Sequence, residues 1–132
     1  MIAGHDYLIR DAYIGNPITD FLKQNCVLFV EAGIVDREAA LKRSTELSPT
    51  CRWEFSREIV GSIAMYRDRI DGIIFLSAFP CGPDAMVNEL MLRRTGGLPA
   101  LNLVLDGQSG VAGTETRLES FLDIIRFKRG ML

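Results

Sequence analysis

The stretch that decides the fold reads Ile70-Asp71-Gly72-Ile73-Ile74-Phe75-Leu76-Ser77-Ala78-Phe79-Pro80-Cys81-Gly82-Pro83-Asp84. The apolar run over residues 72–76 is short, uninterrupted and β-branched, which is typical of a strand buried on both faces. Pro83 and Asp84 predict a helix start, because proline suits the first helical turn and a carboxylate stabilises a helix N-terminus. Cys81 is therefore expected in a tight turn at the carboxyl end of a parallel strand, where ligands bind in open α/β sheets.

The composition indicates one folded domain over residues 1–132, large enough to bury roughly 68% of its unfolded surface. The net charge is −2, so no basic excess favours nucleic-acid binding. No apolar run reaches the ~18 residues of a membrane span, and no signal-peptide pattern opens the chain. The three cysteines are too few and too widely spaced for a disulfide framework. These features favour a cytoplasmic protein that binds neither nucleic acid nor membrane.

Strand patterns alternate with helical patterns along the chain. We expect strands at residues 1–3, 27–30, 72–76 and 100–105, with Asn16 capping the first helix ahead of Pro17. This alternation predicts an α/β, three-layer, flavodoxin-like or Rossmann-like domain with a four-stranded parallel sheet in the order 2-1-3-4. The side chains expected in its core include Val27, Phe29, Ile73, Phe75, Leu103 and Leu105.

The first strand is short, since Gly4 and His5 interrupt it almost at once. Its abrupt end indicates that the domain is a fragment or stand-alone piece of a longer protein. We expect a second copy of the chain or another neighbour to cover the apolar surface there, so a homodimer is one expectation.

Three strand ends would share one edge of this sheet and bring reactive side chains together. The residues expected there are His5, Ser77, Cys81, Asp84, Asp106 and Ser109. His5 is the only histidine, and its ordinary pKa suits proton transfer near neutrality. Cys81 and His5 could act as nucleophile and base, with Ser77, Asp84 and Asp106 as further catalytic candidates. The alternative is a histidine that makes only structural hydrogen bonds.

A helix N-terminus stabilises a thiolate, the form of cysteine that attacks electrophiles or binds iron. Because Asp84 opposes this effect, we expect only a modest lowering of the pKa of Cys81. Cys26 is expected to be a small packed side chain. Cys51 lies in an exposed connection before Trp53, where a functional role is the less favoured alternative.

The segment from Asp106 to Thr114 is a glycine-rich connection between a strand and a helix. Such a turn can present backbone N–H groups to an anion. We therefore expect Ser109, Gly110 and Gly113 of this segment to contribute to cofactor binding, together with Gly82 beside Cys81. The segment has neither the P-loop lysine nor the full dinucleotide fingerprint. The alternative is a loop that needs glycines for its own turns.

Four groups of residues carry a resemblance to a known family. They are His5-x-Tyr7, Trp53-x-Phe55-Ser56-Arg57-Glu58, Phe79-x-Cys81-Gly82-Pro83-Asp84, and Leu105-Asp106-x-x-Ser109-Gly110-x-Ala112-Gly113-x-x-Thr116-Arg117-Leu118-Glu119. In this order they resemble the C-terminal part of the acyl-CoA dehydratase activase-related proteins, relatives of the 2-hydroxyacyl-CoA dehydratase subunits.

The resemblance implies a flavodoxin-like domain of an iron–sulfur, CoA-ester dehydratase or reductase-like redox protein. Cys81 would supply one ligand of the iron–sulfur cluster, and other segments would supply the rest. The implied partner is the remainder of a longer dehydratase-like protein or an activase subunit, and the isolated chain is expected to carry no cluster. The alternatives are a non-catalytic binding or assembly module and a stand-alone Cys/His enzyme.

Overall fold

The computed structural model describes residues 1–106 and 111–131. In chain order the elements are β1 (Ile2–Ala3), α1 (Asp6–Ile9), α2 (Asn16–Gln24), the 3-10 helix η1 (Ala32–Ile34), α3 (Arg37–Leu47), α4 (Glu54–Tyr66), β2 (Ile73–Ala78), α5 (Gly82–Leu92), β3 (Ala100–Leu105) and α6 (Val111–Lys128). Among the described helices, none combines the length and the hydropathy that crossing a bilayer requires.

The described sheet contains three parallel strands in the order β1-β2-β3. The α/β class is therefore confirmed, but the prediction of four strands in the order 2-1-3-4 is wrong. The missing strand is the segment over residues 27–30, which runs beside β1 without forming a ladder. The Ile2 N–H donates to the Val30 carbonyl over 2.8 Å, and this bond belongs to an isolated parallel bridge between Ile2 and Glu31.

The segment over residues 27–30 fails to become a strand for two physical reasons. β1 has only two residues, so it offers a neighbouring strand very few backbone partners. The segment also lacks cover on its outer side: Leu28 is 99% exposed, and Val27 and Phe29 are only half-buried. The apolar pattern therefore reflects packing on one side, and the expected full burial of Val27 and Phe29 is wrong.

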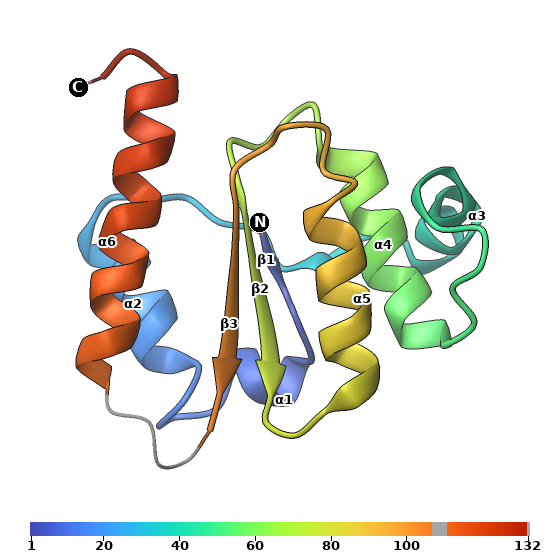
Figure 1. The fold of residues 1–132 in the computed structure, drawn as a ribbon, viewed down its shortest axis with the longest axis horizontal. Coiled ribbons are helices and arrows are strands. Elements are labelled where there is room, and N and C mark those ends of the chain that lie inside the picture. Colours follow the sequence, from blue (N-terminus) through green and yellow to red (C-terminus); the bar gives the residue numbers. More distant parts are fainter. Residues whose placement is uncertain (107–110, 132) are drawn as a thin grey trace.

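Helices cover both faces of the sheet, with α2 and α6 on one face and α4 and α5 on the other, while α3 lies outside α4 (Figure 1). Side chains of β2 alternate between two cores. Ile73 and Phe75 pack into the core under α4 and α5, whereas Ile74 and Leu76 pack into the core under α2 and α6. All four are buried, which confirms the two-sided burial predicted for this strand. Leu103 and Leu105 of β3 are also buried, as expected.

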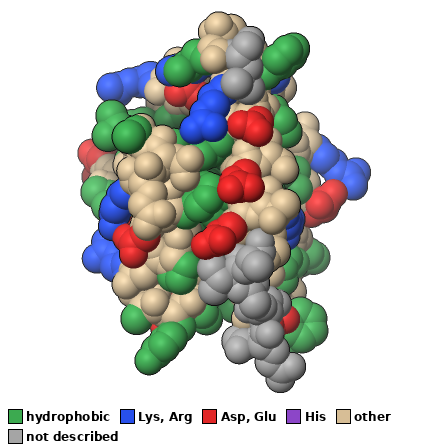
Figure 2. Space-filling view, turned by 90° about the vertical axis from the view of Figure 1, so that its left-hand side faces the viewer, with side chains coloured by type: hydrophobic (Ala, Val, Ile, Leu, Met, Phe, Trp, Pro, Cys, Tyr) green, Lys and Arg blue, Asp and Glu red, His purple; other side chains and the backbone are tan. Residues whose placement is uncertain are grey.

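The solvent face of α6 is acidic along much of its length. Figure 2 shows acidic side chains gathered along this helix. The exposed acids spaced four residues apart are Glu115, Glu119 and Asp123. Ile124 and Phe127 are exposed beside them, so the outer surface of α6 mixes charged and apolar groups.

Helix α2 ends in a Schellman motif with an unusual residue at its left-handed position. The Val27 N–H donates to the Leu22 carbonyl over 2.9 Å, and the Cys26 N–H donates to the Lys23 carbonyl over 3.0 Å. Cys26 has φ 56°, the conformation that this motif normally assigns to glycine. Its side chain is exposed, so the expectation that Cys26 is a packed residue is wrong.

Replacing Cys26 with glycine is expected to stabilise the fold. A side chain in the left-handed region costs about 1–2 kcal/mol, which glycine avoids, although glycine also makes the unfolded chain more flexible. We therefore predict that Cys26→Gly raises the free energy of unfolding by about 1 kcal/mol in denaturant titration. The control is Asn25→Gly, because Asn25 has φ −88° and should gain nothing from glycine. Loss of stability in Cys26→Gly would contradict the prediction.

The α-amino group of Met1 lies inside the fold, where it donates a hydrogen bond to the Gly72 carbonyl over 2.9 Å. Burial lowers the pKa of this group from 8.0 to about 6, while the nearby Asp71 carboxylate partly opposes the shift. The folded state therefore binds this proton less readily than the unfolded state. Stability from the neutral amine is fully present above pH 8 and is lost as the pH falls toward 6.

In a polypeptide that begins at Met1, this shift corresponds to at most about 2–3 kcal/mol of unfolding free energy lost between pH 8 and pH 6. Denaturant titrations across this range measure it. A polypeptide with one glycine before Met1 is the control, because its amide N–H can still donate to Gly72 while the charge moves outward. Equal pH dependence in the two polypeptides would contradict the assignment.

Candidate functional site

His5 follows β1 at the carboxyl edge of the sheet. Gly4 precedes it and passes so close to β2 that an added Cβ would lie 2.9 Å from the Leu76 Cβ. The imidazole ring stacks on Phe55 of α4 with ring centres 3.8 Å apart and an angle of 7° between the planes. A second ring, that of Tyr7, lies 5.2 Å away at 26°. The ring of His5 is thus held between aromatic side chains.

Asp84 of α5 faces the same ring. Its Oδ2 lies 3.3 Å from His5 Nε2, which is ion-pair distance, with the histidine side chain 29% and the aspartate side chain 12% exposed. The approach lacks hydrogen-bond alignment, and Asp84 Oδ2 is buried with no hydrogen-bond partner among the described residues.

Cys81 occupies the N-cap position of α5 and is half-buried. The Asp84 backbone N–H faces its sulfur and lowers the pKa of the thiol, although it does not form a helix-capping hydrogen bond. Partial burial and the Asp84 carboxylate, through hydrogen bonding and negative charge, raise this pKa, and the net shift is upward. The expectation of a modestly lowered pKa is therefore wrong, because burial and the nearby carboxylate together outweigh the backbone N–H at the helix N-terminus.

Tyr7 completes this group. Burial raises the pKa of its phenol, and the charges of Asp84 and Cys81 raise it further. The structure therefore brings together His5, Tyr7, Phe55, Cys81 and Asp84 at one edge of the sheet.

Ser77 and Asp106 are two further residues that the sequence predicted for the site. Ser77 points to the α4–α5 side of β2, where it is 1% exposed and its hydroxyl has no hydrogen-bond partner among the described residues. It is therefore shielded from any substrate. Asp106 follows β3 at the same edge, but β2 lies between that strand and β1.

Gly82 and Gly113, two of the glycines expected at the site, are exposed and make no close approach. An added Cβ at Gly82 or Gly113 would meet no atom within 4 Å, so neither position requires glycine for space. Gly82 is the first residue of α5, and Gly113 lies in the first turn of α6. Ser109 and Gly110 lie outside the described residues.

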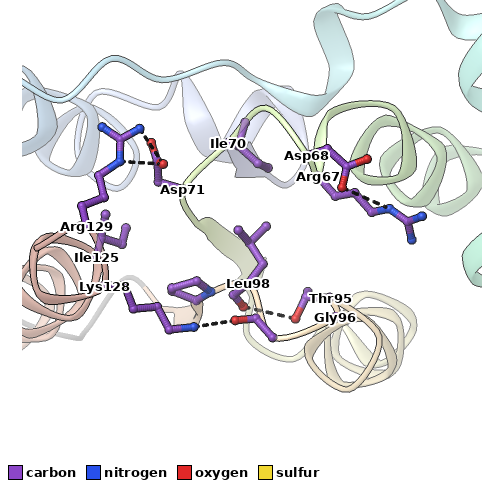
Figure 3. A pocket seen from close by; sticks show the side chains of 12 residues that line it. Arg67, Asp68, Ile70, Asp71, Thr95, Gly96, Leu98, Ile125, Lys128 and Arg129 are labelled. Atoms are coloured by element: carbon purple, nitrogen blue, oxygen red, sulfur yellow. Dashed lines mark hydrogen bonds and ion pairs between the residues drawn. The ribbon is translucent and has the colours of Figure 1, made fainter.

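The group has almost no cavity of its own. The void beside Asp84 holds about 10 Å³, close to the volume of one water molecule. A larger cleft of about 490 Å³ lies at the opposite edge of the sheet (Figure 3). Its cations are already engaged: Arg129 pairs with Asp71 at 2.6 Å, and Lys128 donates to the Gly97 carbonyl over 2.6 Å. Neither space resembles a substrate pocket attached to Cys81.

The described part of the chain also lacks a complete metal site. No group of three or more His, Cys, Asp or Glu side chains within residues 1–106 and 111–131 is arranged to hold an ion. Cys26 and Cys51 do not cluster with Cys81, and all three thiols are free. Because an iron–sulfur cluster takes four cysteine ligands in its usual form, these residues fit at most one corner of such a cluster.

Sequence reasoning placed neither Tyr7 nor Phe55 in the site. Phe55 could have been placed there from its position in the first turn of a helix that connects two parallel strands. Such a helix runs antiparallel to the strands, so its N-terminus returns to their carboxyl edge.

Comparison with known proteins finds no matching family model, no matching curated protein and no matching solved structure. The resemblance to the acyl-CoA dehydratase activase-related proteins therefore stays a prediction.

Neutralising Asp84 should make Cys81 more reactive. Asp84→Asn keeps the backbone N–H that favours the thiolate and removes the carboxylate that opposes it. In a Cys26→Ser, Cys51→Ser background, we predict that this change speeds alkylation by iodoacetamide at neutral pH roughly several-fold. Asp20→Asn, an exposed change on α2, is the control. An unchanged or slower alkylation rate would contradict the role given to the carboxylate.

Proposed function

We propose that this chain is a domain of an iron–sulfur, CoA-ester dehydratase or reductase-like redox protein, in which Cys81 provides one cluster ligand. The observation that supports this proposal is the position of Cys81. It lies half-buried at the carboxyl end of the central strand and the N-terminus of α5, where another segment can approach it.

The described residues act in this proposal as a support for one ligand. β2 fixes the position of the turn, and the Asp84 N–H favours the thiolate that a metal requires. The Asp84 carboxylate contributes to the upward pKa shift of the thiol, and it would stabilise an approaching positive charge. The other ligands must come from the remainder of a longer dehydratase-like protein or from a partner subunit.

The second candidate is a non-catalytic binding or assembly module. It is favoured by the net upward pKa shift of Cys81 and by the contact of 3.3 Å between His5 Nε2 and Asp84 Oδ2, which places the histidine against a carboxylate. Tyr7 and Phe79 are exposed at the same edge and suit contact with a partner. A stand-alone Cys/His enzyme is the least supported, because among the described residues the side chain that hydrogen-bonds the Cys81 thiol is the Asp84 carboxylate and not His5.

A small thiol can stand in for the missing cysteines and test the leading proposal. We would incubate the full chain anaerobically with ferrous iron, sulfide and excess β-mercaptoethanol, and then remove unbound cluster by gel filtration. Wild-type protein is expected to retain iron and visible charge-transfer absorbance, and Cys81→Ser is expected to lose most of both.

Cys26→Ser and Cys51→Ser are matched controls and should behave as wild type, because neither thiol belongs to the group of side chains around Cys81. If Cys81→Ser retains as much iron as these controls, Cys81 is structural. The binding-module alternative would then replace the redox proposal.

A further inference from the structure

A separate cleft lies between the end of α3 and the start of α4. It has a volume of about 350 Å³, which is within the size range of small-molecule sites. The described residues that line it are Thr45, Ser48, Pro49, Cys51, Arg52 and Arg57. None of them is acidic, and two carry guanidinium groups.

The two arginines lack carboxylate partners within the described residues. Arg57 is held in place by helix α3, because its Nη2 donates to the Leu41 carbonyl over 3.2 Å and its Nε to Ser44 Oγ over 3.4 Å. Both partners are neutral, so the charge of Arg57 is uncompensated. Arg52 is exposed, and no ion pair or hydrogen bond engages its side chain in the part of the chain that the structure describes.

The nearby acids of α3 and α4 are already paired elsewhere. Glu54 and Glu58 both pair with Arg37. Glu46 pairs with Arg43 at 2.8 Å. The positive charge in the cleft is therefore not neutralised by these neighbours. In the 490 Å³ cleft, by contrast, Arg129 pairs with Asp71.

Ser48 supplies an independent observation. The residue is 2% exposed, and its hydroxyl has no hydrogen-bond partner among the described residues. A buried hydroxyl without a partner is unfavourable, and a bound acceptor oxygen would remove that cost. A phosphate group offers several acceptor oxygens and a charge close to −2, which matches one hydroxyl and two guanidinium groups.

We propose that the cleft formed by Ser48, Arg52 and Arg57 binds a phosphate group, either free or as the monoester of a small metabolite. The site is independent of Cys81 and of the proposed redox function. Arg57 is pre-positioned by α3, and Arg52 and Ser48, which line the same cleft, supply further donors to the anion.

The test is calorimetric titration of the full chain with inorganic phosphate and, separately, with glycerol 1-phosphate, against chloride at matched ionic strength. Saturable binding is expected in at least one phosphate titration. Arg52→Gln should weaken it about ten-fold, since a charge-assisted hydrogen bond is lost. Arg126→Gln makes the same charge change on α6, across the sheet, and should leave the affinity within about two-fold. Tighter binding of glycerol 1-phosphate identifies a monoester site, and tighter or equal binding of inorganic phosphate identifies a free-phosphate site.

Two further measurements keep the outcome decisive. Ser48→Ala should weaken phosphate binding several-fold while the protein stays at least as stable as wild type, because the hydroxyl has no partner without the ligand. In a Cys26→Ser, Cys81→Ser background, saturating phosphate should slow alkylation of Cys51, which lines the same cleft. Absence of saturable binding overturns the proposal, as does equal weakening by Arg52→Gln and Arg126→Gln or an unchanged affinity in both cleft variants.

Discussion

Burial of β2 on both faces is the constraint on which the rest of the structure depends. A strand shielded from water must pair its backbone groups with neighbouring strands. β3 provides six paired residues, whereas β1 provides only two. The side chains of β2 enter two separate cores, so helices must lie on both sides of the sheet. The position of Cys81 follows from the same strand, because the turn that carries it begins where β2 ends.

The part of the fold that could be predicted from sequence is the part in which burial decides the conformation. The run over residues 72–76 is apolar at every position, and only a two-sided core accommodates it. The run over residues 27–30 is also apolar, but whether it forms a strand depends on the length of β1. Hydrophobic pattern reports that a side chain prefers to leave water and says nothing about whether backbone partners are available.

The candidate site, too, could be predicted from the sequence only in part. Pro83 and Asp84 mark a helix start by local chemistry, so the turn at Cys81 could be predicted. The direction of the Cys81 pKa shift could not, because burial and a carboxylate oppose the helix N-terminus, and tertiary structure decides the balance. Phe55 stacks on His5 only because α4 crosses the sheet at that point. The hydroxyl of Ser48 has no hydrogen-bond partner among the described residues because of how the surrounding chain packs. Such features depend on tertiary geometry that local patterns do not contain.

The outer edge of β3 has a consequence for how this protein behaves in a crowded solution. The carbonyls of Pro99 and Leu105 face β2, so alternate residues such as Asn102 present their backbone groups to the other side. An open edge of this kind can recruit a strand from another molecule and begin aggregation. Arg117 of α6 donates to the Asn102 carbonyl over 2.5 Å and lays a charged side chain across the middle of that edge. A foreign strand would have to displace this guanidinium before it could pair, so one surface arginine helps to keep separate molecules from joining their sheets.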